Sequence, residues 1–382
     1  MIKEMTHSDI LIVGGGLAGL GCAKQLHEQG ESFTLISDTI GGRVKRSPDG
    51  KVNYGAYYVT KDCVNIMPYI TKMRWLKWSD YHFHRGTEHY HIFSPRLLKH
   101  IPAALRLFPD LYRFRRHFNK LRRASLNYPR KELIEADPYL SRLYHMKAAD
   151  YIKEKKLEAF VKEYLEQILW ASFFHDPHEV QAAYFIGSLL PIIVPSYSFE
   201  FRFDELTAPF KDAIVTDTVT KVTRMENGYT VLTKKGVEYS CKTLVLATPM
   251  TVTNQLVPPQ KIKGTIDCSY YHIRGEIKPE YDVRNYNFFS LEEASLTAHE
   301  ADGTYLYFYT AHDNIKKYFN TFEVITKDTW HPALFFLGDE YVDMHPAPNL
   351  FLANDHNVAS TEDAFINGIF AAKTVLQARK KS

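Results

Sequence analysis

Residues 8–19 read SDILIVGGGLAG, a short apolar strand that runs directly into the pattern G-x-G-x-x-G. The small residues of this turn are Gly14, Gly15, Gly16, Ala18 and Gly19. Glycine has no Cβ, so the backbone can turn sharply after the strand and approach a pyrophosphate closely. Apolar residues at helical spacing follow from Leu17 to Leu26, and a second apolar strand occupies 33–37. This βαβ context predicts a dinucleotide-binding domain, whereas the glycine pattern alone would also fit a turn that binds nothing.

A second glycine pair follows the second strand in the stretch IGGRV, residues 40–44. Together with the first motif, this stretch resembles the flavin amine oxidase superfamily, which includes monoamine oxidases, protoporphyrinogen oxidases and phytoene desaturases. The resemblance implies that Gly41 and Gly42 lie along the pyrophosphate of FAD and that Arg43 helps to hold it. A guanidinium group suits that role because it pairs with phosphate through charge-assisted hydrogen bonds.

The second strand departs from the family pattern at its end. The family usually has a glutamate there, which binds the adenosine ribose, but this chain has Ser37 followed by Asp38. Two interpretations remain open: Asp38 or Ser37 contacts the ribose hydroxyls, or Asp38 is only a turn residue.

Two short segments resemble the parts of the family that pass close to the flavin ring. The stretch VNYGA at 52–56 resembles the segment ending in Gly-Ala, so the resemblance places Gly55 and Ala56 beside the ring. The stretch WHPA at 330–333 resembles the segment that leads into the last cofactor strand.

The middle of the chain resembles the adenine side of the family's cofactor domain. Residues 214–222 alternate like one strand, and the resemblance places the backbone of Val219 against the adenine. The stretch TLVLATP at 243–249 ends in the family's Ala-Thr-Pro, which implies that Ala247 and Thr248 belong to the cofactor site.

The last segment of the resemblance is PNLFLAND, residues 348–355. It implies that Asp355 lies next to the ribityl-phosphate arm of the flavin. Asn354 stands where the family has glycine, and asparagine is tolerable there if the backbone is left-handed, because it adopts that conformation more easily than most residues. A helix capped by Ser360 follows, and its Ala364 belongs to the small-residue face expected near the cofactor.

The cofactor segments are separated by two insertions, so the predicted fold class is α/β with discontinuous domains. A Rossmann-type FAD-binding domain would comprise residues 1–60, 205–260 and 335–382. An α+β substrate domain, made of a mixed sheet and inserted helices, would comprise residues 61–204 and 261–334.

Composition and charge limit the kinds of partner and cellular location that we expect for this protein. A net charge of +3 over 382 residues is too small to argue for a nucleic-acid partner. The four cysteines are far apart and lack metal-ligand spacing, which favours reduced thiols and a cytoplasmic protein. The N-terminus is too polar for a signal peptide, and the longest apolar stretch is too short to span a membrane.

Residues 95–131 hold eleven Lys or Arg and a single acid, Asp110, with apolar residues interleaved. Such a basic amphipathic helix could contact an anionic membrane surface weakly. We favour the alternative, a solvated cap whose apolar stripe packs on its own domain.

Two further features could carry chemistry. His82, His84, His89 and His91 could cluster in a hairpin, but no carboxylate or cysteine completes a ligand set, so we predict no metal. Lys278 follows an expected strand, and many amine oxidases of this family have a lysine near this place, linked through water to flavin N5. The resemblance therefore makes Lys278 the candidate catalytic residue.

No Ser-His-Asp, Cys-His or paired-carboxylate arrangement is readable, which fits a flavin enzyme because the cofactor itself accepts electrons. The resemblance implies an oxidoreductase with non-covalent FAD that moves a hydride from a C–N or C–C bond of a hydrophobic small molecule to flavin N5. The alternatives are a flavin-dependent isomerase without net redox and a non-catalytic flavin-bound protein that binds a partner.

Overall fold

The computed structural model describes residues 6–283, 285–358 and 360–380. Its first sheet has the order β8-β2-β1-β11-β10-β9, with β17 beside β11. The strands are β1 (Thr6–Gly16), β2 (Thr34–Gly41), β8 (Ile214–Thr216), β9 (Val219–Met225), β10 (Gly228–Thr233), β11 (Glu238–Leu246) and β17 (Leu350–Leu352). The contacts among β8, β2, β1, β11 and β17 are parallel, as in a Rossmann-like sheet.

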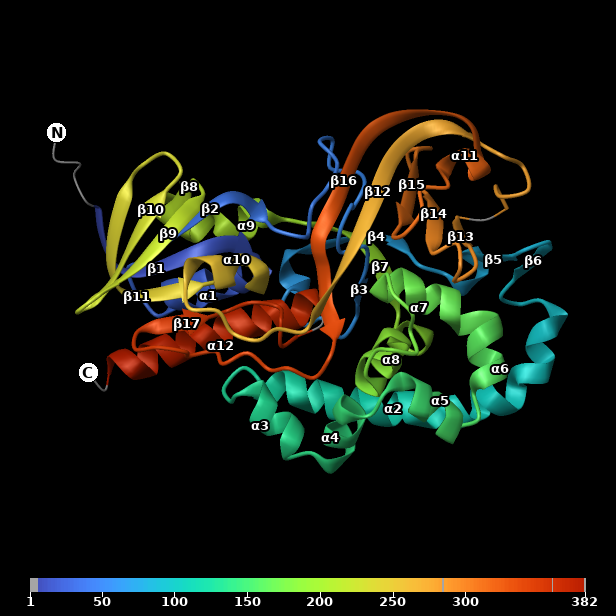
Figure 1. Cartoon of the computed structure of the whole chain (residues 1–382), viewed down its shortest axis with the longest axis horizontal. Coiled ribbons are helices and arrows are strands. Elements are labelled where there is room, and N and C mark those ends of the chain that lie inside the picture. Colours follow the sequence, from blue (N-terminus) through green and yellow to red (C-terminus); the bar gives the residue numbers. More distant parts are fainter. Residues whose placement is uncertain (1–5, 284, 359, 381–382) are drawn as a thin grey trace.

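Two helices from opposite ends of the chain pack together against this sheet, α1 (Leu17–Glu28) and α12 (Thr361–Arg379) (Figure 1). Their backbones approach closely because the contact positions are small. A Cβ at Gly368 would lie 1.8 Å from the carbonyl oxygen of Ala18. The apolar stripe expected from Leu17 to Leu26 is the buried face of α1.

A second sheet has the order β16-β12-β15-β14-β13-β5-β6. Its strands are β5 (Tyr81–Arg85), β6 (Glu88–His91), β12 (Gly264–Ile277), β13 (Tyr286–Phe288), β14 (Ser295–His299), β15 (Tyr305–Tyr309) and β16 (Phe319–Leu337). A small third sheet joins β3 (Val59–Thr60), β7 (Ser196–Phe201) and β4 (Ile70–Trp75). The long β12–β16 ribbon connects the two larger sheets (Figure 1).

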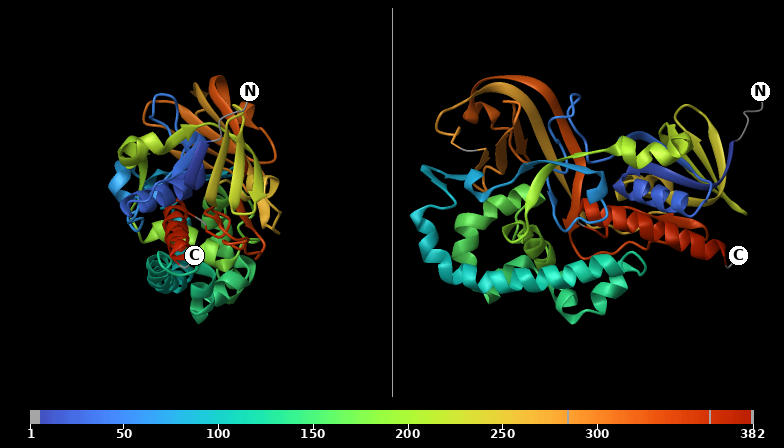
Figure 2. Two further views of the ribbon diagram at one scale, coloured as in Figure 1. Left: turned by 90° about the vertical axis from the view of Figure 1, so that its left-hand side faces the viewer. Right: turned by 180° about the vertical axis from the view of Figure 1, so that it is seen from behind.

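The first insertion contributes a layer of helices under the second sheet (Figure 1). These are α2 (Ile101–Ala124), α3 (Arg130–Glu135), α4 (Pro138–His145), α5 (Ala148–Glu154), α6 (Glu158–Phe160), the π-helix η4 (Val161–Leu165), α7 (Glu166–Phe173) and α8 (Ala182–Ser188). Figure 2 shows α2 running along one side of the molecule, below α12. One large apolar core joins these helices to β12, β13, β14 and β15.

Shorter helices connect the main elements. They are η1 (Met67–Tyr69), η2 (Trp78–Asp80), η3 (Pro95–His100), η5 (Leu190–Ile192), α9 (Phe203–Thr207), η6 (Ala208–Ala213), α10 (Met250–Leu256) and α11 (Ile315–Tyr318).

The predicted fold class, a Rossmann-type α/β sheet with a mixed-sheet and helical part, is confirmed. The first sheet draws its strands from three separate stretches of chain, while the exact domain bounds stay a prediction. One local expectation was wrong. The single strand expected over 214–222 is divided, because Asp217 ends β8 by accepting a hydrogen bond from the backbone N–H of Thr218 at 2.8 Å. Left-handed backbone occurs at Asn349, before β17, and not at Asn354.

Candidate active site

The first glycine turn leaves an open cradle at the start of α1. A Cβ at Gly14 would lie 2.7 Å from the carbonyl oxygen of Ala247, and one at Gly19 would lie 1.9 Å from that of Gly14. These two glycines are therefore required by packing. A Cβ at Gly16 would instead meet no described atom within 4 Å. The backbone of Gly16, the residue that caps α1, thus faces free space at a helix N-terminus, where anions bind favourably.

The second glycine pair lies against the first. Gly41 pairs with Gly16 across β2 and β1, and a Cβ at Gly42 would be 3.2 Å from the Cα of Gly16. Both residues have positive φ, 106° and 56°, which favours glycine. The two turns thus form one continuous strip of backbone without side chains.

Arg43 and Asp355 meet in an ion pair at the end of this strip. The Arg43 guanidinium donates to Asp355 Oδ2 and, at 2.9 Å, to the carbonyl oxygen of Ala333. Both side chains are partly exposed and line the main cavity. The family resemblance implies a separate cofactor contact for each of them, whereas the structure also brings them into contact with each other.

Gly55 and Ala56 lie directly beside Arg43. The backbone N–H of Ala56 donates to the carbonyl oxygen of Arg43 at 3.1 Å, and a Cβ at Gly55 would be 1.8 Å from that oxygen. Both residues line the cavity. Trp330, whose ring lies next to Gly55, and Ala364 of α12 line it as well. The sequence-predicted residues of the ring side are therefore gathered at one cavity.

The residues predicted for the adenosine side lie at the opposite end of the glycine strip and outside this cavity. Ser37 donates its hydroxyl to the carbonyl oxygen of Thr39 at 2.7 Å, and Asp38 is exposed. The segment that leads to Val219 lies alongside, since the backbone N–H of Asp217 donates to the carbonyl oxygen of Ser37 at 3.0 Å.

Three predicted residues support the glycine turn by packing. Ala247 donates its backbone N–H to the carbonyl oxygen of Val13 at 2.7 Å, and Thr248 follows it against Gly14. Ala18 contacts α12 at Gly368.

The cavity has a volume of about 440 Å³ and extends from the glycine strip between the second sheet and the inserted helices. Its walls are mainly apolar and aromatic. The rings that line it include Tyr54, Tyr57, Tyr81, Phe118, Tyr144, Phe174, Tyr184, Tyr286, Phe288, Phe308, Trp330 and Phe336. A pocket of this size and character suits a small molecule with an apolar body.

One wall of the cavity carries a polar group that sequence reasoning missed. The hydroxyl of Tyr57 donates to Glu300 Oε1 at 2.7 Å and lies 3.2 Å from the hydroxyl of Tyr286. Burial raises the pKa of Glu300 to about 7, even though the bond from Tyr57 and the charge of Arg74 lower it. The short sequence around Glu300 gives no signal for this contact, which depends on the pairing of β13 with β14.

We expect Glu300→Gln to weaken the pH dependence of stability between pH 5 and pH 8. The carboxyl group binds its proton more tightly in the folded state, so folding should lose stability as the pH rises from about 4.5 through 7. The neutral amide removes this loss, which is on the order of 2 kcal/mol. Urea unfolding at both pH values measures it, with the exposed Glu226→Gln as the control. An unchanged pH slope in Glu300→Gln would contradict the assignment.

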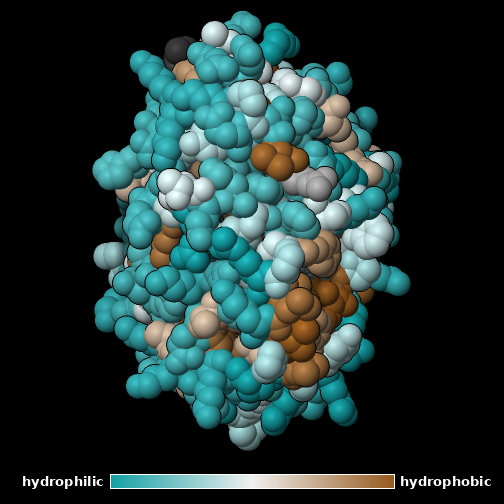
Figure 3. All heavy atoms as spheres, turned by 90° about the vertical axis from the view of Figure 1, so that its right-hand side faces the viewer, coloured by the Kyte–Doolittle hydropathy of each residue, from teal (hydrophilic) through white to brown (hydrophobic). Residues whose placement is uncertain are grey.

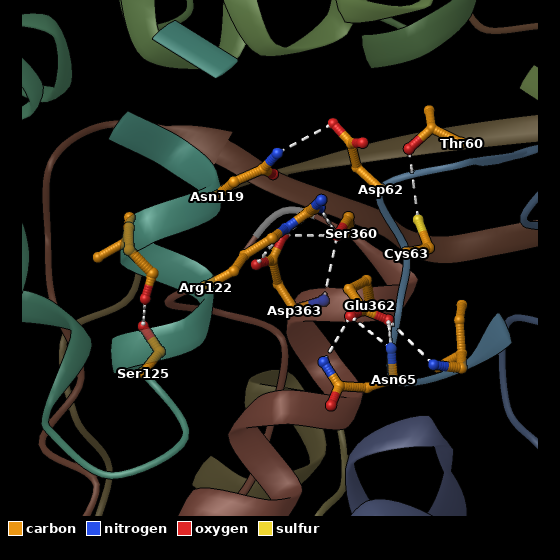
Figure 4. A network of polar contacts seen from close by, with 12 residues as sticks. Thr60, Asp62, Cys63, Asn65, Asn119, Arg122, Ser125, Ser360, Glu362 and Asp363 are labelled. Atoms are coloured by element: carbon orange, nitrogen blue, oxygen red, sulfur yellow. Dashed lines mark hydrogen bonds and ion pairs between the residues drawn. The ribbon is translucent and has the colours of Figure 1, made fainter. Parts of the chain in front are cut away.

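A buried ionic network surrounds the start of α12 (Figure 4). Ser360 caps the helix by accepting the backbone N–H of Asp363 at 3.1 Å, as predicted. The Asp363 carboxylate accepts from Arg122 at 2.9 and 3.1 Å and from Arg130 at 3.0 Å. Burial raises the pKa of Asp363, but the two guanidinium groups outweigh it and hold that pKa well below its usual range.

A neighbouring carboxylate, Glu362, is also fully buried. It accepts hydrogen bonds from the backbone N–H groups of Asn65 and Ile66 and from the Asn65 side chain (Figure 4). Sequence reasoning missed Arg122, although a signal existed. Arg122 lies four residues after Phe118, on the face of α2 that is otherwise apolar.

The prediction that places Lys278 beside the flavin does not fit its position. Its ammonium group donates to the carbonyl oxygens of Lys317 at 2.7 Å and Lys316 at 3.5 Å. Cys268 pairs with Trp330 at the cavity, and Lys278 lies about ten residues further on, roughly 30 Å along the ribbon. We therefore assign Lys278 no part in the chemistry.

The histidines of the β5–β6 hairpin form hydrogen bonds. His84 contacts His89 at 2.7 Å and Asn287 at 3.0 Å, and burial lowers the pKa of His84 to about 4. Within residues 6–283, 285–358 and 360–380, no three His, Cys, Asp or Glu side chains are grouped to hold a metal ion.

All four cysteines are free and buried, and Cys63 lines the cavity. Burial raises the pKa of the Cys63 thiol. No helix in the described part of the chain combines the length and apolar character needed to cross a bilayer.

Comparison with known proteins supports this architecture. The model of the NAD(P)-binding Rossmann-like domain matches residues 12–70, which confirms the predicted dinucleotide-binding opening. A comparison with curated protein sequences gives no match.

Solved structures match over almost the whole chain. Wild-type putrescine oxidase bound to putrescine is 13% identical, with a TM-score of 0.68 and 99% of each chain covered. Cyclohexylamine oxidase from Brevibacterium oxydans is 14% identical, with a TM-score of 0.63, covering 98% of this chain and 99% of the oxidase. The chain therefore has the fold of putrescine oxidase and cyclohexylamine oxidase, as the resemblance to the flavin amine oxidase superfamily implies, and its residues 12–70 match a Rossmann-like dinucleotide-binding domain.

Proposed function

We propose that this protein is an FAD-dependent oxidoreductase that oxidises an amine with an apolar body. The observation that carries the proposal is the continuous strip of side-chain-free backbone, which begins at the N-terminus of α1 and leads past Arg43 and Asp355 into an aromatic cavity. A strip of this kind fits a long cofactor with a charged middle and a flat aromatic end.

The residues present fit FAD. The open space at Gly16 and the N–H groups of α1 would receive the pyrophosphate, with Gly41, Gly42 and Arg43 alongside. Asp355 would stand by the ribityl arm. The ring side would be held by Gly55, Ala56 and Ala364, and the adenosine side by Ser37, Asp38 and Val219.

Bound FAD would supply the acceptor for a hydride from the substrate carbon next to nitrogen. The protein's own part is to bind, orient and exclude water. The aromatic walls suit an apolar body and also attract a substrate ammonium group. Tyr57 and Glu300 offer a polar contact on one wall. The N-terminal end of α12 reaches the cavity through Thr361 and Ala364, and the partial positive charge of its helix dipole favours negative charge nearby.

Three further details of the proposal are each supported by a separate observation. Non-covalent attachment is supported by the raised pKa of the Cys63 thiol, which disfavours a reactive thiolate. A cytoplasmic location is supported by four free, buried cysteines. Amine substrates are supported by the folds of putrescine oxidase and cyclohexylamine oxidase.

An anaerobic substrate screen tests the proposed activity. The purified protein would be mixed without oxygen with cyclic, aromatic and linear amines, and the flavin absorbance near its visible maximum recorded. We expect apolar monoamines to bleach the flavin faster than short diamines, whose second ammonium group has no place among the aromatic walls. Product formation without bleaching would instead identify an isomerase, and no response to any amine or apolar alkene would leave a flavin-bound partner-binding protein.

A further inference from the structure

The outer face of α2 carries a row of exposed apolar side chains. They are Ile101, Leu105, Phe108 and Tyr112 of α2, together with Leu98 of η3 directly before it, and each is between 39% and 67% exposed. Their spacing of three and four residues places them on one side of the helix, over about 20 Å. We call these five residues the outer stripe.

The outer stripe is separate from the face that holds α2 in the fold. The opposite side of the helix packs into the large core through Leu107, Leu111, Phe114, Phe118 and Leu121. The expectation that the apolar residues of 95–131 pack on their own domain is thus correct for this inner face and wrong for the outer stripe. Burial of the inner face alone accounts for folding, so the outer stripe needs another explanation.

The end of the molecule where α2 begins shows this apolar surface directly. Figure 3 views that end and shows a compact apolar patch within a mostly hydrophilic surface. Phe93, which precedes α2 and is also exposed, lies close in sequence to the first residues of the stripe.

Exposed basic side chains follow the outer stripe on the same face of α2. Arg116, Lys120 and Arg123 follow Tyr112 on that side, all exposed, and none forms an ion pair within the described residues. Other cations of the segment are already neutralised inside the protein, for example Arg115 by Asp62. We call Arg116, Lys120 and Arg123 the cationic end.

No negative charge on α2 opposes an anionic partner. The single acid of 95–131 is Asp110. Its carboxylate accepts a hydrogen bond from the hydroxyl of Tyr151 and forms an ion pair with the ammonium group of Lys155. An exposed apolar row combined with unpaired cations on one helix face matches the two attractions offered by a bilayer with anionic headgroups.

We propose that α2 docks this protein onto the surface of an anionic membrane, with the outer stripe in the headgroup–acyl boundary and the cationic end on the headgroups. This inference goes beyond the proposed function and does not depend on it. The inner face of the same helix contributes Phe118 and Arg122 to the cavity wall. Docking would therefore place one wall of the cavity next to a source of apolar molecules.

Co-sedimentation of the full-length protein, as purified, with lipid vesicles tests the proposal. The vesicles would be phosphatidylcholine alone, or phosphatidylcholine with about one third phosphatidylserine. We expect binding to the anionic vesicles at low salt, and binding at least about tenfold weaker to neutral vesicles or at high salt.

Two sets of variants separate the contributions. Leu98→Gln with Leu105→Gln removes part of the outer stripe, and Arg116→Glu with Arg123→Glu reverses the cationic end. Each pair should weaken binding at least about tenfold, since each cation near such a surface contributes substantially. The matched control is Val324→Gln with Ile325→Gln, exposed apolar residues of β16, which should bind as the parent does. Thermal unfolding verifies that all variants fold.

Three outcomes would overturn the proposal. The parent could fail to bind anionic vesicles, or both variant pairs could bind as well as the parent. Alternatively, light scattering could show a dimer that the Leu98→Gln, Leu105→Gln pair converts to a monomer, which would make the outer stripe an interface between two copies of the chain.

Discussion

Gly16→Val is expected to give a folded protein that no longer retains FAD. A Cβ at this position meets no described atom within 4 Å, so the valine side chain fits the protein itself. It would occupy the space in front of α1 that we assign to the pyrophosphate. Losing the close backbone contacts should lower FAD affinity by about 100-fold or more, which corresponds to the loss of at least one or two charge-assisted hydrogen bonds.

Two other glycine substitutions serve as comparisons, one expected to keep the flavin and one expected to disrupt folding. Gly30→Asn lies at the other end of α1, where the position is also open and φ is +75°, and should keep its flavin. Gly19→Ala places a Cβ 1.9 Å from the carbonyl oxygen of Gly14 and should disrupt folding. Flavin content and the unfolding midpoint of each purified variant separate the two effects. Full flavin content in Gly16→Val would show that the cofactor lies elsewhere.

Asp363→Ala is expected to cause a large loss of folding stability. The carboxylate is fully buried and compensates two arginines, Arg122 and Arg130, which are themselves buried. Removing one partner of a buried ionic network leaves uncompensated charge and typically costs about 3–5 kcal/mol. Urea unfolding with saturating FAD would measure this difference.

Asp62→Ala is the matched control. Asp62 forms an ion pair with Arg115, which lies on α2 as Arg122 does, and this pair is partly exposed. That change should cost about 1 kcal/mol or less. The pKa of Asp363 is lowered in the folded state, so its contribution is present above about pH 4 and is lost as the pH falls below that value. Equal losses in the two variants would contradict the account of the α12 terminus.

The βαβ opening and the N-terminal cap of α12 could be predicted from sequence because the signals for both are local. The glycines of the turn, the apolar stripe of α1 and the cap at Ser360 each depend on neighbours within a few residues. The resemblance assigned Ala247 and Thr248 to the cofactor site, but it gave no expectation of the contact between Ala247 and Gly14 that the structure shows.

The rest of the site depends on contacts between distant segments. The Arg43–Asp355 pair joins positions more than three hundred residues apart, and the Tyr57–Glu300 bond joins the first cofactor segment to the second insertion. Neither pair has a local signal. Lys278 was misplaced because a lysine after a strand says nothing about how far that strand extends from the cofactor. Residues 95–131 contain buried arginines, such as Arg122, and exposed ones, such as Arg116. Composition alone could not distinguish the two kinds.

Identification of the released chromophore tests the central claim most directly. The protein would be expressed with ample riboflavin, purified, denatured, and the supernatant separated by chromatography with FAD, FMN and nicotinamide dinucleotide standards. The account predicts FAD in the supernatant, close to one molecule per chain, with no flavin left on the precipitated protein. FMN alone, a nicotinamide dinucleotide alone, or no flavin would contradict it.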